Sequence, residues 1–295
     1  TVLTCSDCGY VFKCPNCDVP LTYHKHINKL KCHYCNYEMD KVEECSKCHS
    51  KRVNSFGMGT EKLEQEINNI FKDAKTIRMD VDTTSKKGSH ERIINDFDQG
   101  LYDILIGTQM IAKGLDFPNV TLVGVINGDA TLNIPDFRNA ERTFQLLNQV
   151  AGRAGRSSKK GNVIIQGFNI DHYSIMYASK HDYMSFYNEE MKIRKILKYP
   201  PFCNLAFIYL TGKNLDTITI EGNKITKFLK DKLNDTVVLG PSIANIPKIN
   251  NIYHMQVIIK YKTLKDIYKC LDYLNNHYKD KNNINVEIDI NPLRI

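Results

Sequence analysis

The chain has 295 residues, an ordinary apolar content of 42% and a formal net charge of +7. That length is enough to bury a sizeable core and to form two or three domains. No apolar run reaches the roughly 18 residues that a membrane-spanning helix needs, and no secretory signal is visible at the start. The chain opens with Thr1 and reaches a cysteine cluster within five residues, so we expect a fragment of a longer protein.

Residues 1–54 are predicted to form a cysteine-rich module. Eight of the ten cysteines occur in four Cys-x-x-Cys pairs: Cys5/Cys8, Cys14/Cys17, Cys32/Cys35 and Cys45/Cys48. Two thiolates at this spacing suit one tetrahedral zinc ion, so the pattern predicts two structural four-cysteine sites without an open catalytic position. A disulfide framework is more typical of small secreted proteins, and a redox Cys-x-x-Cys usually occurs singly.

The spacing leaves the pairing of these cysteines open. Sequential pairing joins the first two pairs and the last two, whereas nested pairing places the outer pairs around the inner ones. Eight thiolates and two zinc ions would lower the net charge to about +3, so global charge argues only weakly for nucleic acid. Tyrosine, phenylalanine and lysine side chains of the module suit either stacking on single-stranded DNA or packing in a small core.

Residues 55–170 are predicted to form an α/β lobe. Helices are expected at 61–71 and 89–99, with Thr60 and Ser89 as caps. The apolar side chains of the first helix, the last of which is Phe71, are expected to form one face. Strands are expected at 76–82, 103–107, 120–126 and 162–168. Apolar strands that alternate with helices indicate a parallel sheet covered on both faces, which binds ligands at the carboxyl ends of its strands.

Two stretches at element ends carry candidate chemistry. Residues 106–118 read I-G-T-Q-M-x-x-K-G-x-D-F-P, and residues 149–156 read Q-V-A-G-R-A-G-R. The planar fork of arginine suits phosphate oxygens, and two arginines three residues apart can reach one target. The alternative for the second stretch is a basic helix end favoured by the helix dipole.

Together with Asp136–Phe137–Arg138 and Glu141–Arg142, these stretches resemble motifs V and VI of superfamily two helicases. The residues of these motifs are similar to those of the primosomal protein N′ (PriA) family of bacterial replication-restart helicases, and the resemblance covers nearly the whole chain. It implies a RecA-like second helicase lobe at 55–170. It also implies nested zinc pairing, with Cys5, Cys8, Cys45 and Cys48 around Cys14, Cys17, Cys32 and Cys35.

The resemblance also implies roles for individual residues. Arg156 would be an arginine finger at the ATP γ-phosphate, with Arg153 as its companion and Gln149 nearby. Gly114 and Asp116 would lie near the nucleotide ribose. Thr108, Gln109 and Lys113 would contact DNA. Asp116 is otherwise a turn residue before Pro118.

No Gly-x-x-x-x-Gly-Lys-Ser/Thr loop and no Asp-Glu-x-His tetrad occurs in the sequence. The groups that hold the ATP phosphates and Mg would therefore belong to another lobe, and we expect this chain to be inactive alone.

The alternatives are another zinc-containing superfamily two translocase or, for the fragment, a non-enzymatic scaffold that binds DNA or a partner. The implied partners are forked and single-stranded DNA, single-stranded-DNA-binding protein and primosome proteins. No membrane contact is expected, and the implied location is the bacterial cytoplasm at the nucleoid.

Residues 171–202 are predicted to form a helical connector, helical from Asp171 to Leu197 and ending at Tyr-Pro-Pro-Phe. Residues 203–295 are predicted to form a ferredoxin-like α+β domain. Its strands are expected at 205–210, 236–239, 252–261 and 284–290, and its helices at 215–233 and 264–278. A loop is expected from Gly240–Pro241 to Ile249–Tyr253.

The family usually has arginine where this chain has His254, which weakens a DNA role for that strand. Lys248, Lys260 and Lys262 form a modest basic set whose default is solvated surface, with contact to DNA or single-stranded-DNA-binding protein as a hypothesis.

Overall fold

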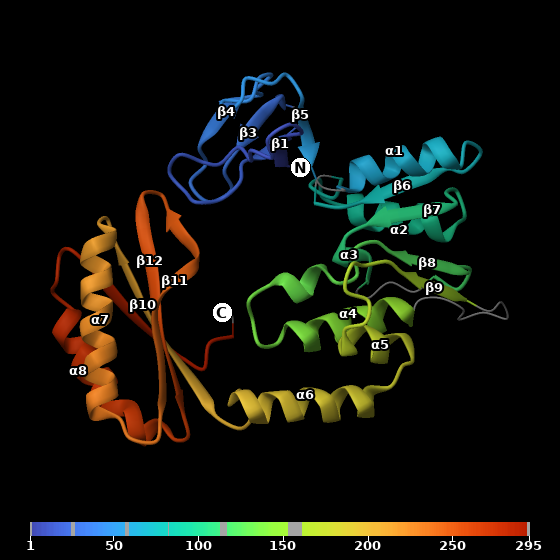
Figure 1. Cartoon of the computed structure of the whole chain (residues 1–295). Coiled ribbons are helices and arrows are strands. Elements are labelled where there is room, and N and C mark those ends of the chain that lie inside the picture. Colours follow the sequence, from blue (N-terminus) through green and yellow to red (C-terminus); the bar gives the residue numbers. More distant parts are fainter. Residues whose placement is uncertain are drawn as a thin grey trace. The chain divides into compact units, whose positions relative to one another are not determined.

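The structure is a computed structural model that describes residues 2–24, 27–56, 59–81, 83–112, 117–152 and 161–293. The chain divides into two compact units (Figure 1). The first combines residues 1–57 with 194–295, and the second comprises residues 58–193. No helix in the described part of the chain has the length and apolarity needed to span a membrane.

The cysteine-rich module of the first unit is a small antiparallel sheet in the order β4-β3-β2-β1-β5. Its strands have only three or four residues each: β1 (Val2–Cys5), β2 (Thr22–His24), β3 (Lys29–Lys31), β4 (Glu38–Asp40) and β5 (Val53–Phe56). The buried core contains Leu3, Phe12, Leu21 and Leu30 together with three cysteines. A core of this size is marginal without a crosslink or metal, which fits a module built around cysteine clusters.

The C-terminal domain of the first unit has a four-stranded antiparallel sheet in the order β11-β12-β10-β13. Two helices cover one face of it (Figure 1). The elements are β10 (Asn204–Gly212), α7 (Leu215–Lys232), β11 (Val237–Ile249), β12 (Ile252–Tyr261), α8 (Leu264–Tyr278) and β13 (Asn285–Ile290). The predicted β-α-β-β-α-β order is confirmed, and the strand order is the ferredoxin-like one.

Local sequence explains where these elements start and how they pack. Ala206, Ile208 and Leu210 alternate along β10 and pack into the main core with α7 and α8. The side chain of Asn214 caps α7 by accepting the N–H of Thr217 over 2.9 Å. A capping box of Thr263 and Asp266 starts α8.

Two predictions for this domain are wrong. Gly240–Pro241 does not begin a loop, because β11 continues through it to Ile249 with irregular register. As an edge strand, β11 tolerates the missing N–H of Pro241, and Gly240 takes a φ of 105°. Lys260 is not solvated surface: it is buried, its Nζ donates to the carbonyl of Leu197 over 2.7 Å, and it lies 3.7 Å from the centroid of the Tyr199 ring.

The second unit contains two parallel strand pairs with helical crossovers, β6–β7 and β8–β9. The strands are β6 (Thr76–Met79), β7 (Ile104–Gly107), β8 (Leu122–Val125) and β9 (Asn162–Ile165). The helices are α1 (Thr60–Ile70), α2 (Ser89–Asp98), α3 (Gln109–Ala112), the 3-10 turn η2 (Ala130–Asn133), α4 (Asn139–Ala151), α5 (Tyr173–Ser179) and α6 (Tyr183–Leu197), the last of which runs on into the first unit. The predicted mixed α/β character with parallel pairing is confirmed.

Several details of this unit differ from the prediction. Glycines occupy the N-caps of α1 and α2, so Thr60 and Ser89 are first helical residues and not caps. The Oγ1 of Thr60 instead donates to a carboxylate oxygen of Asp80 over 2.5 Å. The apolar face expected for the first helix is only partly covered, since Ile70 and Phe71 are exposed.

The predicted single helix over 171–197 is two helices, α5 and α6. Between them His181 has a positive φ of 53°, which a helix cannot accommodate. The sequence carries neither glycine nor proline at this break, so no strong breaker signal marks it.

Candidate functional site

The eight paired cysteines gather into two clusters of four. One contains Cys5, Cys8, Cys45 and Cys48, and the other contains Cys14, Cys17, Cys32 and Cys35. Within each cluster all sulfurs lie within 4.8 Å of one another. The sulfurs therefore group in the nested way that the family resemblance implies. We call the first set the outer cluster and the second set the inner cluster.

The sulfur separations fit a tetrahedral metal and not a disulfide. Cys5 and Cys48 sulfurs lie 3.5 Å apart, Cys8 and Cys45 sulfurs 3.7 Å, and Cys14 and Cys35 sulfurs 3.5 Å. A Zn–S bond of about 2.3 Å in tetrahedral geometry places sulfurs about 3.8 Å apart, whereas a disulfide needs about 2.05 Å. Both clusters are consistent with structural zinc, and each set of four thiolates fills the tetrahedron.

The electrostatics of the inner cluster also favour a cation. Burial raises the pKa of Cys14 to about 12, while the backbone N–H of Tyr37 lowers the pKa of Cys35 to about 7. Sulfurs at this separation resist simultaneous ionisation because like charges repel. A dication removes that obstacle by binding all four as thiolates. In the outer cluster the N–H of Cys8 likewise lowers the pKa of Cys5 to about 7.

The first candidate stretch, residues 106–118, begins where the backbones of β7 and β6 approach each other closely. A Cβ atom on Gly107 would lie 2.5 Å from the carbonyl oxygen of Met79 on the neighbouring strand β6. Glycine lets β7 end there and turn directly into α3, where Thr108 and Gln109 are exposed. The remaining residues predicted for this stretch, Lys113, Gly114 and Asp116, lie outside the described residues.

The second motif begins at the end of α4. Gln149 lies in the last turn of this helix and is exposed, and α3 contacts α4 within the same unit. Gln109, which follows Thr108, and Gln149 therefore lie on two helices that contact each other. Arg153 and Arg156 lie outside the described residues, so their placement stays a prediction.

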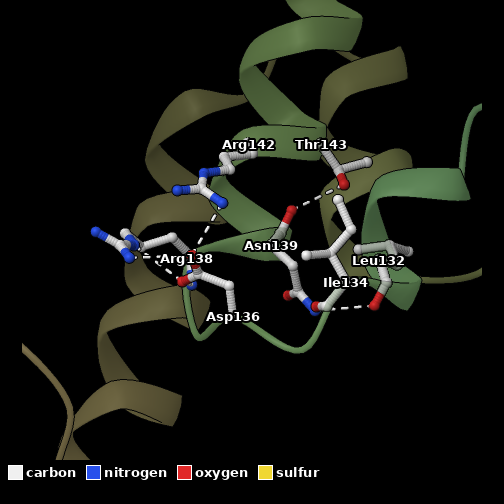
Figure 2. A network of polar contacts seen from close by, with 7 residues as sticks. All are labelled: Leu132, Ile134, Asp136, Arg138, Asn139, Arg142 and Thr143. Carbon is white, nitrogen blue, oxygen red and sulfur yellow. Dashed lines mark hydrogen bonds and ion pairs between the residues drawn. The ribbon is translucent and has the colours of Figure 1, made fainter. Parts of the chain in front are cut away.

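A polar network holds the start of α4 (Figure 2). One oxygen of Asp136 accepts the backbone N–H and the Nε of Arg138, at 3.0 and 2.9 Å. The other accepts Nη2 of Arg138 at 3.0 Å and Nη1 of Arg142 at 2.9 Å. Asn139 donates to the carbonyls of Leu132 and Ile134. The helix that leads to Gln149 is therefore anchored at its first turn.

Asp136, Arg138 and Arg142 belong to the sequence stretch that resembles the family, but the resemblance implied no role for them. The Asp136 carboxyl is almost fully buried, with an exposed side-chain fraction of 1%. Burial raises its pKa, but the hydrogen bonds and charges of the two arginines outweigh burial and hold the pKa below its usual value. A signal was available, since one acid followed by two arginines at the start of an apolar helix suggests an ion-paired cap.

Comparisons with known proteins agree along the chain. Residues 14–39 match the "PriA DNA helicase Cys-rich region (CRR) domain", residues 36–158 the "Helicase conserved C-terminal domain", and residues 195–293 the "Primosomal protein N C-terminal domain". Replication restart protein PriA of Bacillus subtilis is 48% identical over 98% of this chain and 36% of its own length. The chain belongs to the PriA family.

Other PriA proteins show the same relation. The Synechocystis protein is 38% identical over the full chain and 36% of its own length, and that of Chlamydia pneumoniae is 40% identical over 99% of the chain and 40% of its own length. The chain thus spans about two fifths or less of the PriA relatives named here and matches their C-terminal part. A Dbp5 structure from S. cerevisiae shares 20% identity with a TM-score of 0.28, covering 48% of this chain and 37% of that one, which is too slight a likeness to argue from.

Proposed function

We propose that this chain is the C-terminal part of an ATP-dependent 3′-to-5′ DNA helicase that recognises stalled forks and initiates primosome assembly. The carrying observation is the match to PriA proteins along the whole chain at up to 48% identity among the relatives named. These relatives are named replication restart proteins, and the family that residues 14–39 match is described as a region of a DNA helicase. The function comes to this chain from those relatives.

In this proposal the lobe of residues 55–170 completes an ATP site that another lobe begins. Arg156 and Arg153 neutralise charge on the γ-phosphate, and Gln149 lies beside them. Gly114 and Asp116 face the ribose. ATP supplies the free energy for movement, and Mg neutralises phosphate charge when bound. The sequence has no Gly-Lys-Ser/Thr loop, so phosphate and Mg ligands come from outside this chain.

Thr108, Gln109 and Lys113 grip DNA in the proposed enzyme. Thr108 is exposed just before α3 and Gln109 is exposed at its start, and α3 contacts the helix that carries Gln149. The contact between these two helices supports coupling between DNA binding and the state of the bound nucleotide. The proposed partners are forked and single-stranded DNA, single-stranded-DNA-binding protein and primosome proteins, in the bacterial cytoplasm at the nucleoid.

The cysteine module, residues 1–54 in this proposal, holds two structural zinc ions, one in each cluster. Each ion fixes short strands that cannot form a stable core alone. We further propose 171–202 as connector and 203–295 as the C-terminal domain. Without its partner lobe, the chain acts only as a scaffold that binds DNA or protein.

The test is ATP hydrolysis by the full-length protein that contains this sequence. Arg156→Ala is expected to lower the DNA-stimulated kcat by about 10³-fold or more while ATP still binds, as for other arginine fingers. Arg92→Ala, an exposed arginine of α2, is the matched control and should leave kcat unchanged. The isolated chain should not hydrolyse ATP. A normal kcat in Arg156→Ala, or hydrolysis by the isolated chain, would overturn the proposed division of the ATP site.

A further inference from the structure

The turn between β11 and β12 reaches a cysteine segment more than 230 residues earlier in the chain. Asn250 and Asn251 form this turn with φ values of 49° and 62°, and Ile249 pairs with Ile252 on either side of it. Positive φ at both central positions is the type I′ turn, whose twist matches a β-hairpin and which asparagine tolerates. The turn is therefore a well-defined tip on the β11–β12 hairpin, seen in orange in Figure 1.

The tip contacts the segment that contains Cys14 and Cys17. The backbone N–H of Asn250 donates to the sulfur of Cys17 over 3.1 Å. The N–H of Asn251 donates to the carbonyl of Asn16 over 2.8 Å, and the N–H of Asp18 donates to the carbonyl of Lys248 over 2.9 Å. The hairpin and the cysteine segment both belong to the first compact unit. The hairpin therefore binds this cysteine segment largely through backbone groups.

Side chains add to this contact. The Nζ of Lys248 donates to the carbonyl of Pro15 over 3.1 Å, and Ile249 packs against the buried core of the cysteine module. Cys17 itself is 1% exposed. The hydrogen bond to its sulfur is therefore shielded from water. A hydrogen bond is stronger in such a buried environment than in water.

Outer hydrogen bonds of this kind matter to a metal site. A metal-bound thiolate keeps negative charge and accepts N–H groups, which fix its orientation, and losing such a partner typically costs about 10- to 100-fold in metal affinity. In the inner cluster Asn16 approaches the sulfur of Cys35 from within the module, with its Nδ2 at 3.9 Å. The donor to Cys17 comes from the C-terminal domain.

We propose that docking of the β11–β12 turn and metal binding at the inner cluster are thermodynamically coupled. The Asn250 N–H is a positioning group for Cys17, so the docked hairpin raises the affinity of the inner cluster for its zinc ion and thereby slows loss of that ion. By reciprocity, the bound ion holds the C-terminal domain on the cysteine module by the same factor. The outer cluster has no part in this coupling. The inference rests on the proposed zinc sites.

The first test is release of zinc from the zinc-loaded chain to a chromophoric chelator. Ile249→Asp places a carboxylate against the apolar core and undocks the turn, so one of two ions should leave about 10-fold faster and the other at the normal rate. Ile243→Asp is the matched control, because Ile243 lies on the same strand and is 54% exposed. It should release both ions as the unsubstituted chain does.

Two further variants separate the backbone from the side chain of Asn250. Asn250→Gly keeps the N–H and the positive φ and should release zinc normally. Asn250→Val is strained at positive φ and should speed release of one ion. Normal release in both Ile249→Asp and Asn250→Val would overturn the coupling. A chain that binds no zinc would overturn the proposed sites and the coupling with them.

The reciprocal arm measures hydrogen exchange of the amides of residues 248–252. Cys14→Ser, which damages the inner cluster, should speed their exchange, whereas Cys48→Ser, which damages the outer cluster, should not. Equal exchange in the two variants would contradict the coupling even if Ile249→Asp failed to fold.

Discussion

Asp136 and Arg138 form a two-point contact, with one carboxylate oxygen 2.9 Å from Nε and the other 3.0 Å from Nη2. Arg142 adds a third contact from the first turn of α4, at 2.9 Å. A buried acid shared by two arginines fixes the direction in which α4 leaves its preceding loop. The same helix carries Gln149 and leads into the arginine motif, so this contact supports the proposed ATP site from a distance.

Asp136→Asn should destabilise the second unit. The neutral amide cannot match two guanidinium groups, and hydrogen bonds to charged partners contribute about 1.5–3 kcal/mol each. We expect the free energy of unfolding to fall by about 2 kcal/mol, measured by urea denaturation. Asp98→Asn, an exposed acid at the end of α2, should change it by less than about 0.5 kcal/mol. Equal effects of the two variants would contradict a structural role for the Asp136 contact.

Gly107→Ala tests the close approach of β7 to β6. The new methyl group would meet the Met79 carbonyl at 2.5 Å and Cγ2 of Ile111 at 2.7 Å. Backbone on a paired strand cannot move aside cheaply, so overpacking should cost about 1–3 kcal/mol. Gly124→Ala in β8 is the control, because nothing lies within 4 Å of its Cβ position. Thermal unfolding of both variants decides, and a loss in Gly107→Ala no larger than in Gly124→Ala would argue against the contact.

Glu221 should make the C-terminal domain acid-sensitive. A hydrogen bond from Lys224, supported by Tyr278 and the charge of Lys281, lowers the pKa of Glu221 to about 2. An unfolded glutamate titrates near pH 4.3, so the folded pKa is the lower one. The stabilisation is therefore complete above about pH 5 and is lost as pH falls toward 2.

The measurement compares the chain with Glu221→Gln at each pH, so that zinc loss common to both proteins cancels. At pH 7 the variant should be less stable by about 1 kcal/mol, as for partly exposed ion pairs. That difference should shrink toward zero near pH 2. A difference that stays constant from pH 7 to pH 2 would show that the carboxylate charge contributes nothing.

Much of the fold was predictable because the signals are local. The C-terminal domain follows alternating apolar strands and periodic helices, and α8 begins and ends at the predicted residues, Leu264 and Tyr278. The Cys-x-x-Cys spacing indicated metal ligands, but it left the pairing open until the family resemblance implied the nested clusters. Local patterns of this kind do not depend on distant parts of the chain.

The errors arose where a local signal competes with tertiary context. Gly240–Pro241 is typical of a loop, yet an edge strand accommodates both residues within β11. Lys260 is a surface residue by type, but a carbonyl and an aromatic ring hold it inside. The Asn250–Asn251 pair between isoleucines was a readable turn signal. Its contact with Cys17 was not predictable, because nothing local links residues so far apart in sequence.

The most direct test of the paired metal sites is the zinc content of the purified chain, measured together with its reactive thiols. We predict two zinc ions per chain and two thiols that react in the native state, Cys203 and Cys270. Burial raises the pKa of both thiols, so their reaction should quicken as pH rises. Ten thiols should react after denaturation with a chelator. Fewer than two zinc ions, with disulfides in their place, would contradict the paired four-cysteine sites and leave the proposed function resting on the helicase motifs and the family match.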